Sequence, residues 1–273
     1  MDTLLPSSAN SRPPIDPTGR AFYRHGLTLL SDAQVPFLVG GAYALECYTG
    51  ISRYTKDLDI FVQPSDRDRI IEILTNAGYQ ADVTFPHWLA KAYYGEYFID
   101  IIFSSGNGIC VVDDAWFAHA PRREVIGVPV LLCPMEEIIW SKSFVLERER
   151  YDGADIAHIF RVCAERLNWP RLMDRFGAHW RVLFSHLVLF GFIYPAERGR
   201  IPEWVMQKLI ALLTEEMRDV PPSGQLCQGT LLSREQYLTD VMQWGYEDAR
   251  LQPTGRMTRE NIAHWTAAID EKE

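Results

Sequence analysis

Two aspartates separated by one residue lie inside an apolar stretch, "DLDIFV", at residues 57–62. In a β-strand alternate side chains share a face, so Asp57 and Asp59 would project side by side, about 7 Å apart along the backbone. Two carboxylates that close repel each other, which raises one pKa unless a cation lies between them. Oxygen ligands on a rigid strand suit Mg²⁺ or Mn²⁺. The pair predicts a metal site, although an isolated pair of this kind is more often a solvated strand end.

Two further features accompany the aspartate pair. Upstream, the short apolar strand "VPFLVGG" ends in Gly40 and Gly41 and is followed by a short helix, so that a phosphate could meet free amides at a helix N-terminus. Downstream, Asp100 lies inside the apolar strand "YFIDIIF", where a carboxylate is costly unless it is paired. Three carboxylates on neighbouring strands would form a two-metal site for in-line phosphoryl displacement.

The surrounding elements divide the chain into two unlike parts. Residues 1–17 are rich in Pro and Ser and predict a disordered tail. Residues 18–133 mix predicted helices, at 18–32 and 65–78, with short strands, and form an α+β unit. Residues 134–273 show helical periodicity and no predicted strand, and Pro134 opens the first of their helices.

Composition narrows the function classes. The net charge of −9, from 27 basic and 36 acidic residues, argues against a protein that coats nucleic acid by bulk charge, but leaves room for a local basic groove. The five cysteines form no CxxC pair, which favours a reducing cytosol over a disulfide framework. The apolar run at 182–194 is too short to span a bilayer. We therefore expect a cytoplasmic protein without a membrane partner.

The order GG–x(11)–R–x–T–x–D–L–D, followed by an apolar strand with one Asp, resembles the nucleotidyltransferase superfamily typified by DNA polymerase beta and the aminoglycoside nucleotidyltransferases. The resemblance implies a small mixed-sheet nucleotidyltransferase domain followed by an all-α helical bundle. It covers roughly residues 36–104 in its specific motifs. The matching residues are Gly40, Gly41, Arg53, Thr55, Asp57, Asp59 and Asp100.

The resemblance implies transfer of a nucleoside monophosphate from an NTP to an acceptor, with release of pyrophosphate. Asp57 and Asp59 would hold both Mg²⁺ ions, and Asp100 would complete the metal site and take the proton of the acceptor. Gly40 and Gly41 would carry the triphosphate.

Two other matched residues have open roles. Thr55 would either bond a phosphate oxygen or cap the turn before the strand. Arg53 would either stabilise the triphosphate or brace Asp57 or Asp59.

A second, looser resemblance begins at Pro134. The segment "LCPMEEIIWSKSFVLERERYDGADIAHI" is similar to the one that follows the catalytic domain in the AbiEii-like toxin nucleotidyltransferases and related bacterial proteins. It implies that Lys142 is the cation for the triphosphate or the leaving pyrophosphate. Charged residues on a helix are as often a solvated face, and the roles of Asp152, Asp155 and the 223–238 segment stay open. The matching residues are Pro134, Lys142, Arg148, Arg150, Asp152 and Asp155.

Two functions compete at this point. The first is an active Mg²⁺-dependent nucleotidyltransferase whose acceptor is a tRNA end, an antibiotic hydroxyl or a protein side chain. The second is a catalytically degenerate nucleotidyltransferase fold that binds or regulates within a toxin–antitoxin system and pairs with an antitoxin. Degenerate copies usually lose a metal ligand, whereas Asp57, Asp59 and Asp100 are all present. The sequence therefore favours the enzyme.

Overall fold

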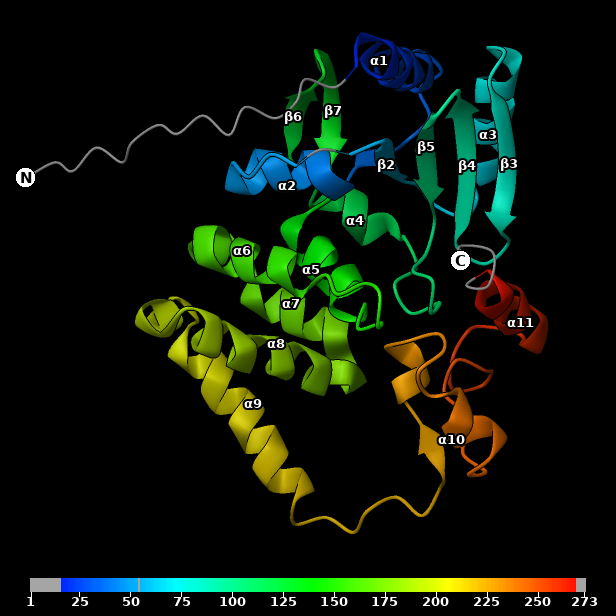
Figure 1. Ribbon diagram of the computed structural model, residues 1–273. Helices are drawn as coiled ribbons and strands as arrows, with labels where there is room; N and C mark the ends of the chain where they lie inside the picture. Colours follow the sequence, from blue (N-terminus) through cyan, green and yellow to red (C-terminus); the bar gives the residue numbers. More distant parts are fainter. Residues whose placement is uncertain (1–15, 54, 269–273) are drawn as a thin grey trace, which may run out of the picture.

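The structure is a computed structural model that describes residues 16–53 and 55–268, so most of the tail predicted at 1–17 lies outside the described residues. Its N-terminal half is built on a seven-stranded sheet with the order β3-β4-β5-β2-β1-β7-β6 (Figure 1). The strands are β1 (Leu38–Val39), β2 (Asp57–Phe61), β3 (Gln80–Phe85), β4 (Leu89–Tyr94), β5 (Tyr97–Ile102), β6 (Arg122–Val125) and β7 (Val128–Leu132).

The sheet is mixed, as predicted. β2 runs parallel to β5 and antiparallel to β1, and β1 runs parallel to β7. The pairs β3–β4, β4–β5 and β6–β7 are antiparallel. Because β2 and β5 are parallel neighbours, residues with matching register on the two strands project side by side from one face.

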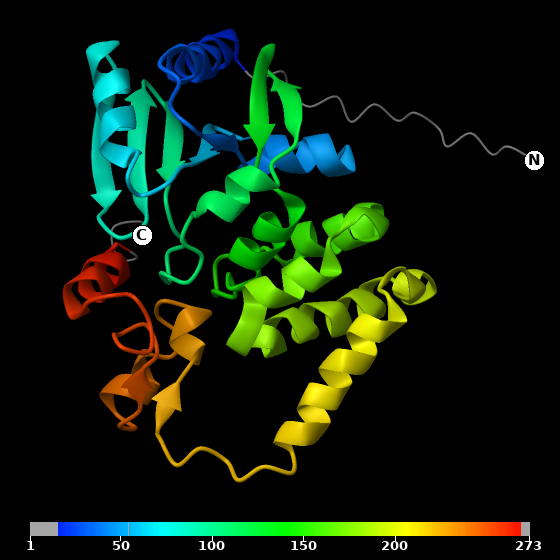
Figure 2. The same cartoon turned by 180° about the vertical axis from the view of Figure 1, so that it is seen from behind.

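Helices cover the sheet on both faces. α1 (Pro17–Asp32) and α3 (Arg67–Asn76) pack on one face, which Figure 2 shows toward the viewer. α2 (Gly41–Thr49) follows β1 directly and packs against β2, and α4 (Asp114–Ala118) precedes β6. α1 buries Phe22, Tyr23, Leu27 and Leu30, an apolar stripe at helical spacing that anchors it on the sheet.

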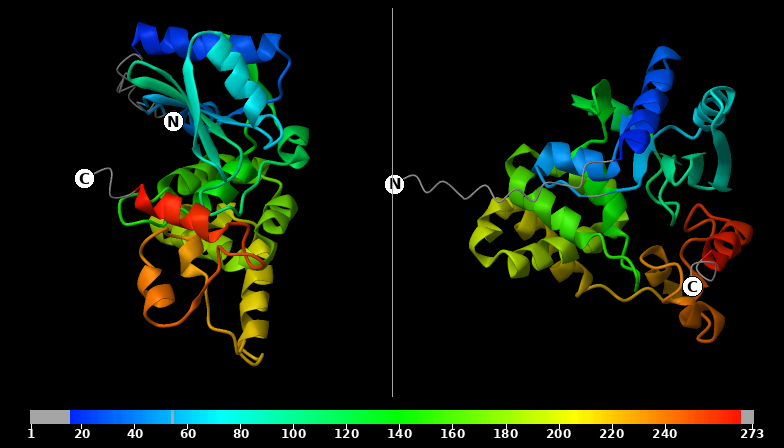
Figure 3. Two further views of the ribbon diagram at one scale, coloured as in Figure 1. Left: turned by 90° about the vertical axis from the view of Figure 1, so that its right-hand side faces the viewer. Right: turned by 45° about the horizontal axis from the view of Figure 1, so that its top comes forward.

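The second half of the chain begins with a helical bundle, as predicted (Figure 3). α5 starts one residue after Pro134, and α2 packs against α6, which joins the bundle to the sheet domain. The bundle helices are α5 (Met135–Ser143), α6 (Gly153–Cys163), α7 (Trp169–Phe176), α8 (Trp180–Ile193) and α9 (Glu203–Glu216).

The C-terminal segment does not stay with the bundle. It carries a two-residue parallel pair, β8 (Leu226–Cys227) and β9 (Glu247–Asp248), where the sequence predicts no strand. After α10 (Leu238–Met242), α11 (Arg259–Ala267) returns to the edge strand β3 of the sheet domain (Figure 1). The rings of Phe85 and His264 lie 5.3 Å apart at this contact.

One helical segment among the described residues, Trp169–Ile193, is long and apolar enough by length and composition to cross a membrane. It exceeds the apolar run at 182–194 because α7 and α8 follow each other with only a 3₁₀ turn at Gly177–His179 between them. The segment packs Phe176, Leu183 and Phe190 into the core. Length and composition alone do not separate a core helix from a membrane helix.

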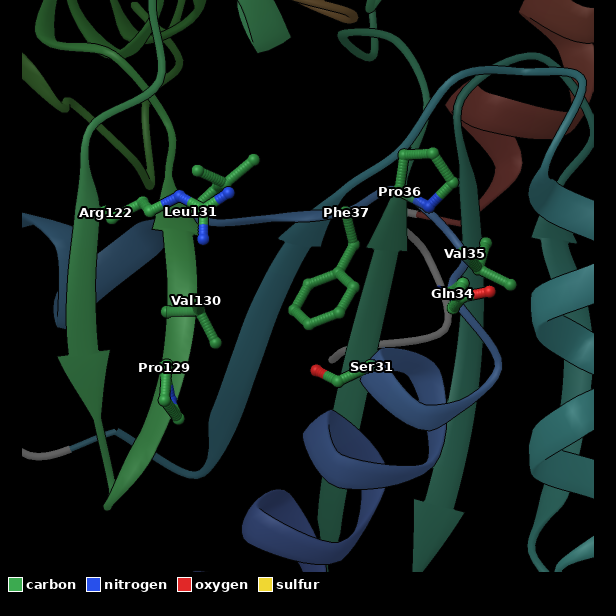
Figure 4. Close-up of a pocket in the computed structure, with 9 residues that line it drawn as sticks. All are labelled: Ser31, Gln34, Val35, Pro36, Phe37, Arg122, Pro129, Val130 and Leu131. Carbon is green, nitrogen blue, oxygen red and sulfur yellow. The ribbon is translucent and has the colours of Figure 1, made fainter.

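A groove of about 450 Å³ lies where the end of α1 approaches β7 and the start of β1 (Figure 4). Its floor is apolar and its rim carries Ser31, Gln34 and Arg122. The aspartates named above do not line it. The full set of lining residues is Ser31, Gln34, Val35, Pro36, Phe37, Arg122, Pro129, Val130 and Leu131.

Candidate active site

The three aspartates meet on one face of the sheet. Asp59 on β2 lies directly opposite Asp100 on β5, and Asp57 lies two residues earlier on the same face of β2. One carboxylate oxygen from each of the three lies within 4.8 Å of the others. The alternation that points the aspartates to this face buries Leu58 and Ile60 on the other. The residues that the sequence singled out therefore form one cluster.

Burial and like charge act together on this cluster. Burial is the main cause that raises the pKa of Asp59 to about 7, and the neighbouring charges of Asp57 and Asp100 contribute to the same rise. Burial also raises the pKa of Asp100, although the ammonium of Lys91 opposes the rise. Such a site is short of positive charge and takes up either protons or cations.

Both glycines lie where a Cβ atom would clash with a neighbouring side chain of β2. A Cβ on Gly41 would lie 1.7 Å from Oδ2 of Asp59, and Gly41 has φ +52, so only glycine permits the start of α2 to lie against this carboxylate. A Cβ on Gly40 would lie 2.2 Å from the ring of Phe61.

The hydrogen bond of the Gly40 amide disagrees with the sequence-based expectation that both glycines carry the triphosphate. This amide donates to the backbone oxygen of Asp59 at 2.9 Å, which continues the strand ladder, and is therefore not free for a phosphate. No side-chain cap hydrogen bond forms at the N-terminus of α2, which begins at Gly41.

Thr55 supports Asp57. Its hydroxyl donates a short hydrogen bond to Oδ1 of Asp57, and the Asp57 amide lies 3.4 Å from the same Oγ1. This arrangement agrees with the expected turn cap before the strand and directs the hydroxyl at the carboxylate. The bond fixes the rotamer of Asp57 at the edge of the cluster.

Lys142 on α5 lies in a partly buried network of charges. Its Nζ is 2.7 Å from Oδ2 of Asp152 and 3.0 Å from Oδ2 of Asp155. Arg150 holds Asp152 with both Nε and Nη2, at 3.1 and 3.0 Å. Asp152 and Asp155 thus supply Lys142 with anionic partners from the protein itself.

The Lys142 network borders the three aspartates. The positive charges of Lys142 and Arg150 both lower the pKa of Asp59, against the larger effect of burial. Burial raises the pKa of Asp152, but the nearby cations Lys142 and Arg150 outweigh it, so that the net pKa is lowered and Asp152 stays ionised. A positive region therefore lies beside the negative cluster.

Arg53 joins the same network. Its guanidinium forms an ion pair with Asp155, and its Nη2 lies 3.4 Å from Nδ1 of His158. Of the two roles expected for Arg53, the brace for Asp57 or Asp59 is not found, because the side chain reaches α6 instead.

Lys91 is a charged neighbour of the cluster that sequence reasoning missed. It lies on β4 opposite Asp100, and its Nζ is 2.7 Å from Oδ1 of that aspartate. A signal was present in the alternation of "LAKAYY", which places Lys91 on the opposite face from the buried Ala90 and Ala92.

The start of α5 is fixed by a second ion network. Glu137 is fully buried and contacts Arg171 and Arg175 of α7, and Glu136 lies 3.0 Å from Arg171. Removing one partner from a buried network of this kind leaves an uncompensated charge, which is strongly destabilising. The network fixes α5, which carries Lys142, against α7.

The 223–238 segment holds the loop that carries Arg150. Arg234 lies 3.1 Å from Glu147, and the amide of Leu146 donates to the backbone oxygen of Leu232 at 3.0 Å. Asn107, from the loop after β5, donates to the backbone oxygen of Leu231 at 2.7 Å. The segment thus links the loops after β5 and α5.

Comparison with known proteins finds similarity in structure. The antibiotic-resistance factor ANT(2'')-Ia has 18% identity and a TM-score of 0.46, and the match covers 63% of this chain and 98% of that one. The lincosamide antibiotic adenylyltransferase LnuA, solved with lincomycin, has 17% identity and a TM-score of 0.38, over 52% of this chain and 96% of its own.

A nucleotidyltransferase-like protein from Paracoccidioides brasiliensis has 16% identity and a TM-score of 0.35, over 72% and 88% of the two chains. The matched structures include nucleotidyltransferases. The chain matches no protein-family model and no curated protein sequence.

Proposed function

We propose that the protein is a nucleotidyltransferase that moves a nucleoside monophosphate from an NTP to a nucleophile on an acceptor. The observation that carries this proposal is the convergence of Asp57, Asp59 and Asp100, with ligand atoms within 4.8 Å of one another, near the start of α2, which has no side-chain cap. Carboxylates, a phosphate-binding helix end and nearby cations are the parts that phosphoryl transfer needs.

The carboxylate cluster fits a divalent cation. All its donors are oxygens, and burial together with the like charges of Asp57 and Asp100 raises the pKa of Asp59 to about 7. Mg²⁺ and Mn²⁺ prefer oxygen donors, so Asp57, Asp59 and Asp100 would hold either ion. A bound ion would neutralise charge on the phosphates and on the reacting oxygens.

The chemical step can be assigned to groups of this chain. The acceptor oxygen forms a bond to the α-phosphorus, the bond from the α-phosphorus to the bridging oxygen breaks, and the electron pair leaves with pyrophosphate. Asp100, which is partly exposed, accepts the proton of the acceptor. Asp57, held by Thr55, and Asp59 keep the ligand set in place.

The triphosphate would lie between α2 and the Lys142 network. The α2 amides beginning at Gly41 would bind phosphate oxygens, since a helix N-terminus favours anions. Lys142 and Arg150, whose charges already act on Asp59, would stabilise the charge that develops on the leaving pyrophosphate.

The acceptor remains one of three classes: a tRNA end, an antibiotic hydroxyl or a protein side chain. A reducing cytoplasm would supply the NTP and Mg²⁺. The complete carboxylate set argues for catalysis and against a degenerate binding module paired with an antitoxin.

The experiment is incubation of the full-length protein with each α-³²P-labelled NTP, Mg²⁺ and representatives of the three acceptor classes in separate reactions, namely total RNA, aminoglycosides with lincosamides, and cell protein. We expect label on one class and pyrophosphate in equal amount. The Asp57→Asn, Asp59→Asn double variant serves as the matched control and should transfer nothing. Equal transfer by this variant and the wild type would reject the proposal.

A further inference from the structure

Lys91 occupies a position in the sheet that faces two carboxylates. On β4 it is in register with Asp82 of β3 on one side and Asp100 of β5 on the other. Its ammonium contacts Asp100, with Nζ 2.7 Å from Oδ1. The two side chains are 20% and 14% exposed, so the pair is largely shielded from water. Asp100 is thus paired with a cationic side chain of the protein itself, Lys91.

A second contact restrains the ammonium of Lys91. Its Nζ lies 4.1 Å from the centre of the Phe98 ring, which is on β5 next to Asp100 along the same face. An ammonium over an aromatic face is attracted by the ring quadrupole. The ring and the carboxylate together hold the positive charge at the Asp100 end of the cluster.

We propose that Lys91 is a built-in counter-charge that weakens metal binding at Asp100 and leaves Asp57 and Asp59 as the tight metal site. This inference rests on the proposed function and specifies how its site is divided. An ammonium on one oxygen of Asp100 competes for that carboxylate, and it repels any divalent cation bound to the other oxygen. Asp57 and Asp59 carry no such contact from Lys91.

The division has a consequence for the reaction. Asp100 is the group that accepts the acceptor's proton, so it must keep a free oxygen and a fixed orientation. Lys91 provides the orientation through the contact to Oδ1. Lys91 is accordingly a positioning residue that acts through Asp100.

A plain cross-strand ion pair would also stabilise the sheet, and the two roles predict opposite changes. If Lys91 only stabilises the sheet, its removal loosens β4 and β5 and leaves metal affinity unchanged or lower. If Lys91 is a counter-charge, its removal makes the Asp100 end more negative and raises metal affinity there.

The test is a titration of the metal-free, full-length protein with Mn²⁺ alone, in which free Mn²⁺ is counted by electron paramagnetic resonance. We expect the wild type to show a tight and a weak class of site. Lys91→Met should tighten the weak class at least tenfold and leave the tight class within threefold. Lys91→Arg, which keeps the charge, should behave as the wild type.

The matched control is Lys56→Met. Lys56 forms an ion pair with Glu96 at 2.6 Å, but both side chains are more than half exposed and lie outside the carboxylate cluster. This variant should bind Mn²⁺ as the wild type does. If Lys91→Met fails to fold, as judged by urea denaturation, Lys91→Gln is measured in its place.

Unchanged or weaker Mn²⁺ binding by the Lys91 variant would overturn the proposal that Lys91 acts as a counter-charge. A separate arm addresses the metal site itself, because the Asp57→Asn, Asp59→Asn variant should lose the tight class. If the Asp57→Asn, Asp59→Asn variant keeps the tight class of Mn²⁺ sites, both the metal site and the role of Lys91 are rejected. If that variant loses the tight class but the Lys91 variant binds Mn²⁺ as the wild type does, only the role of Lys91 is rejected.

Discussion

At the scale of single residues, Asp59 has the most strained electrostatic position of the cluster. Burial and two neighbouring carboxylates raise its pKa to about 7, while the same group in an unfolded chain titrates near 3.8. A bound proton and a bound metal ion are alternative ways of relieving this repulsion. The choice between them depends on pH.

Stability of the metal-free protein should therefore fall with rising pH through this window. The folded state binds the Asp59 proton more tightly than the unfolded state, so the stabilisation from this group is present below about pH 4 and lost as pH rises to about 7. Mg²⁺ should restore stability, and should do so more at pH 8 than at pH 6, because protons compete for the carboxylates at pH 6.

Thermal unfolding with and without Mg²⁺ at the two pH values measures this effect. Asp59→Asn is the control, and its rise in Tm with Mg²⁺ should differ little between pH 6 and pH 8. A rise in Tm with Mg²⁺ that is equal at pH 6 and pH 8 in the wild type would contradict the assignment of the cluster as a metal site.

Lys142 is expected to matter for both catalysis and stability. Lys142→Ala should lower kcat by about two to three orders of magnitude, the scale seen when one electrostatic stabiliser is lost. It should also cost about 1–3 kcal/mol of folding free energy, because Asp152 and Asp155 lose a charged partner.

Steady-state kinetics and urea denaturation measure the two effects of Lys142→Ala. Lys208→Ala, on the exposed side of α9, is the control and should change neither. Near-normal turnover by Lys142→Ala would assign its role to Arg150 or Arg53.

At the scale of elements, the start of α2 is the most constrained segment of the site. Gly41→Ala places a Cβ 1.7 Å from Oδ2 of Asp59 and puts alanine at φ +52. The left-handed conformation alone costs about 1–2 kcal/mol, and the clash adds to it by moving either the helix or the carboxylate. We expect loss of metal binding and at least a hundredfold loss of activity.

Gly50→Ala separates the clash from the backbone effect. Gly50 ends the same helix at φ +72, but a Cβ there would meet nothing within 4 Å. This variant should lose about 1–2 kcal/mol and keep its metal affinity. Mn²⁺ titration and denaturation of both variants separate the effect of the clash from that of the backbone conformation. Equal metal affinities of the two variants would show that α2 does not need to approach Asp59 so closely.

The elements also explain which parts of the site the sequence could predict. The period-2 alternation of β2 and β5 placed Asp57, Asp59 and Asp100 on one face, and the structure confirms it. β4 was not predicted, because the Ala and Lys in "LAKAYY" have low β propensity, so Lys91 was overlooked. Its position depends on pairing with β5, which is a long-range property of the fold.

At the scale of the whole molecule, the site is assembled from both halves of the chain. The carboxylates come from the sheet, whereas Lys142 and Arg150 come from α5 and the loop after it. The loop is in turn tied to the 223–238 segment through Arg234 and Glu147. Local sequence patterns cannot predict this link, because it joins residues 87 positions apart.

Residues 1–133 alone should therefore be inactive. This fragment keeps the carboxylates but lacks the Lys142 network, and it exposes the face of α2 that packs against α6. We expect turnover at least a thousandfold below that of the full chain, measured as pyrophosphate release at equal protein concentration. Turnover at the full-length rate would show that the second half of the chain does not take part in the reaction.

The most direct measurement of the central claim is anomalous X-ray diffraction from crystals grown with Mn²⁺ and a non-hydrolysable NTP analogue. The account predicts a Mn²⁺ peak within about 2.0–2.4 Å of carboxylate oxygens of Asp57 and Asp59, with the triphosphate of the analogue against the first turn of α2. An analogue bound elsewhere, with no Mn²⁺ at the aspartates, would contradict it.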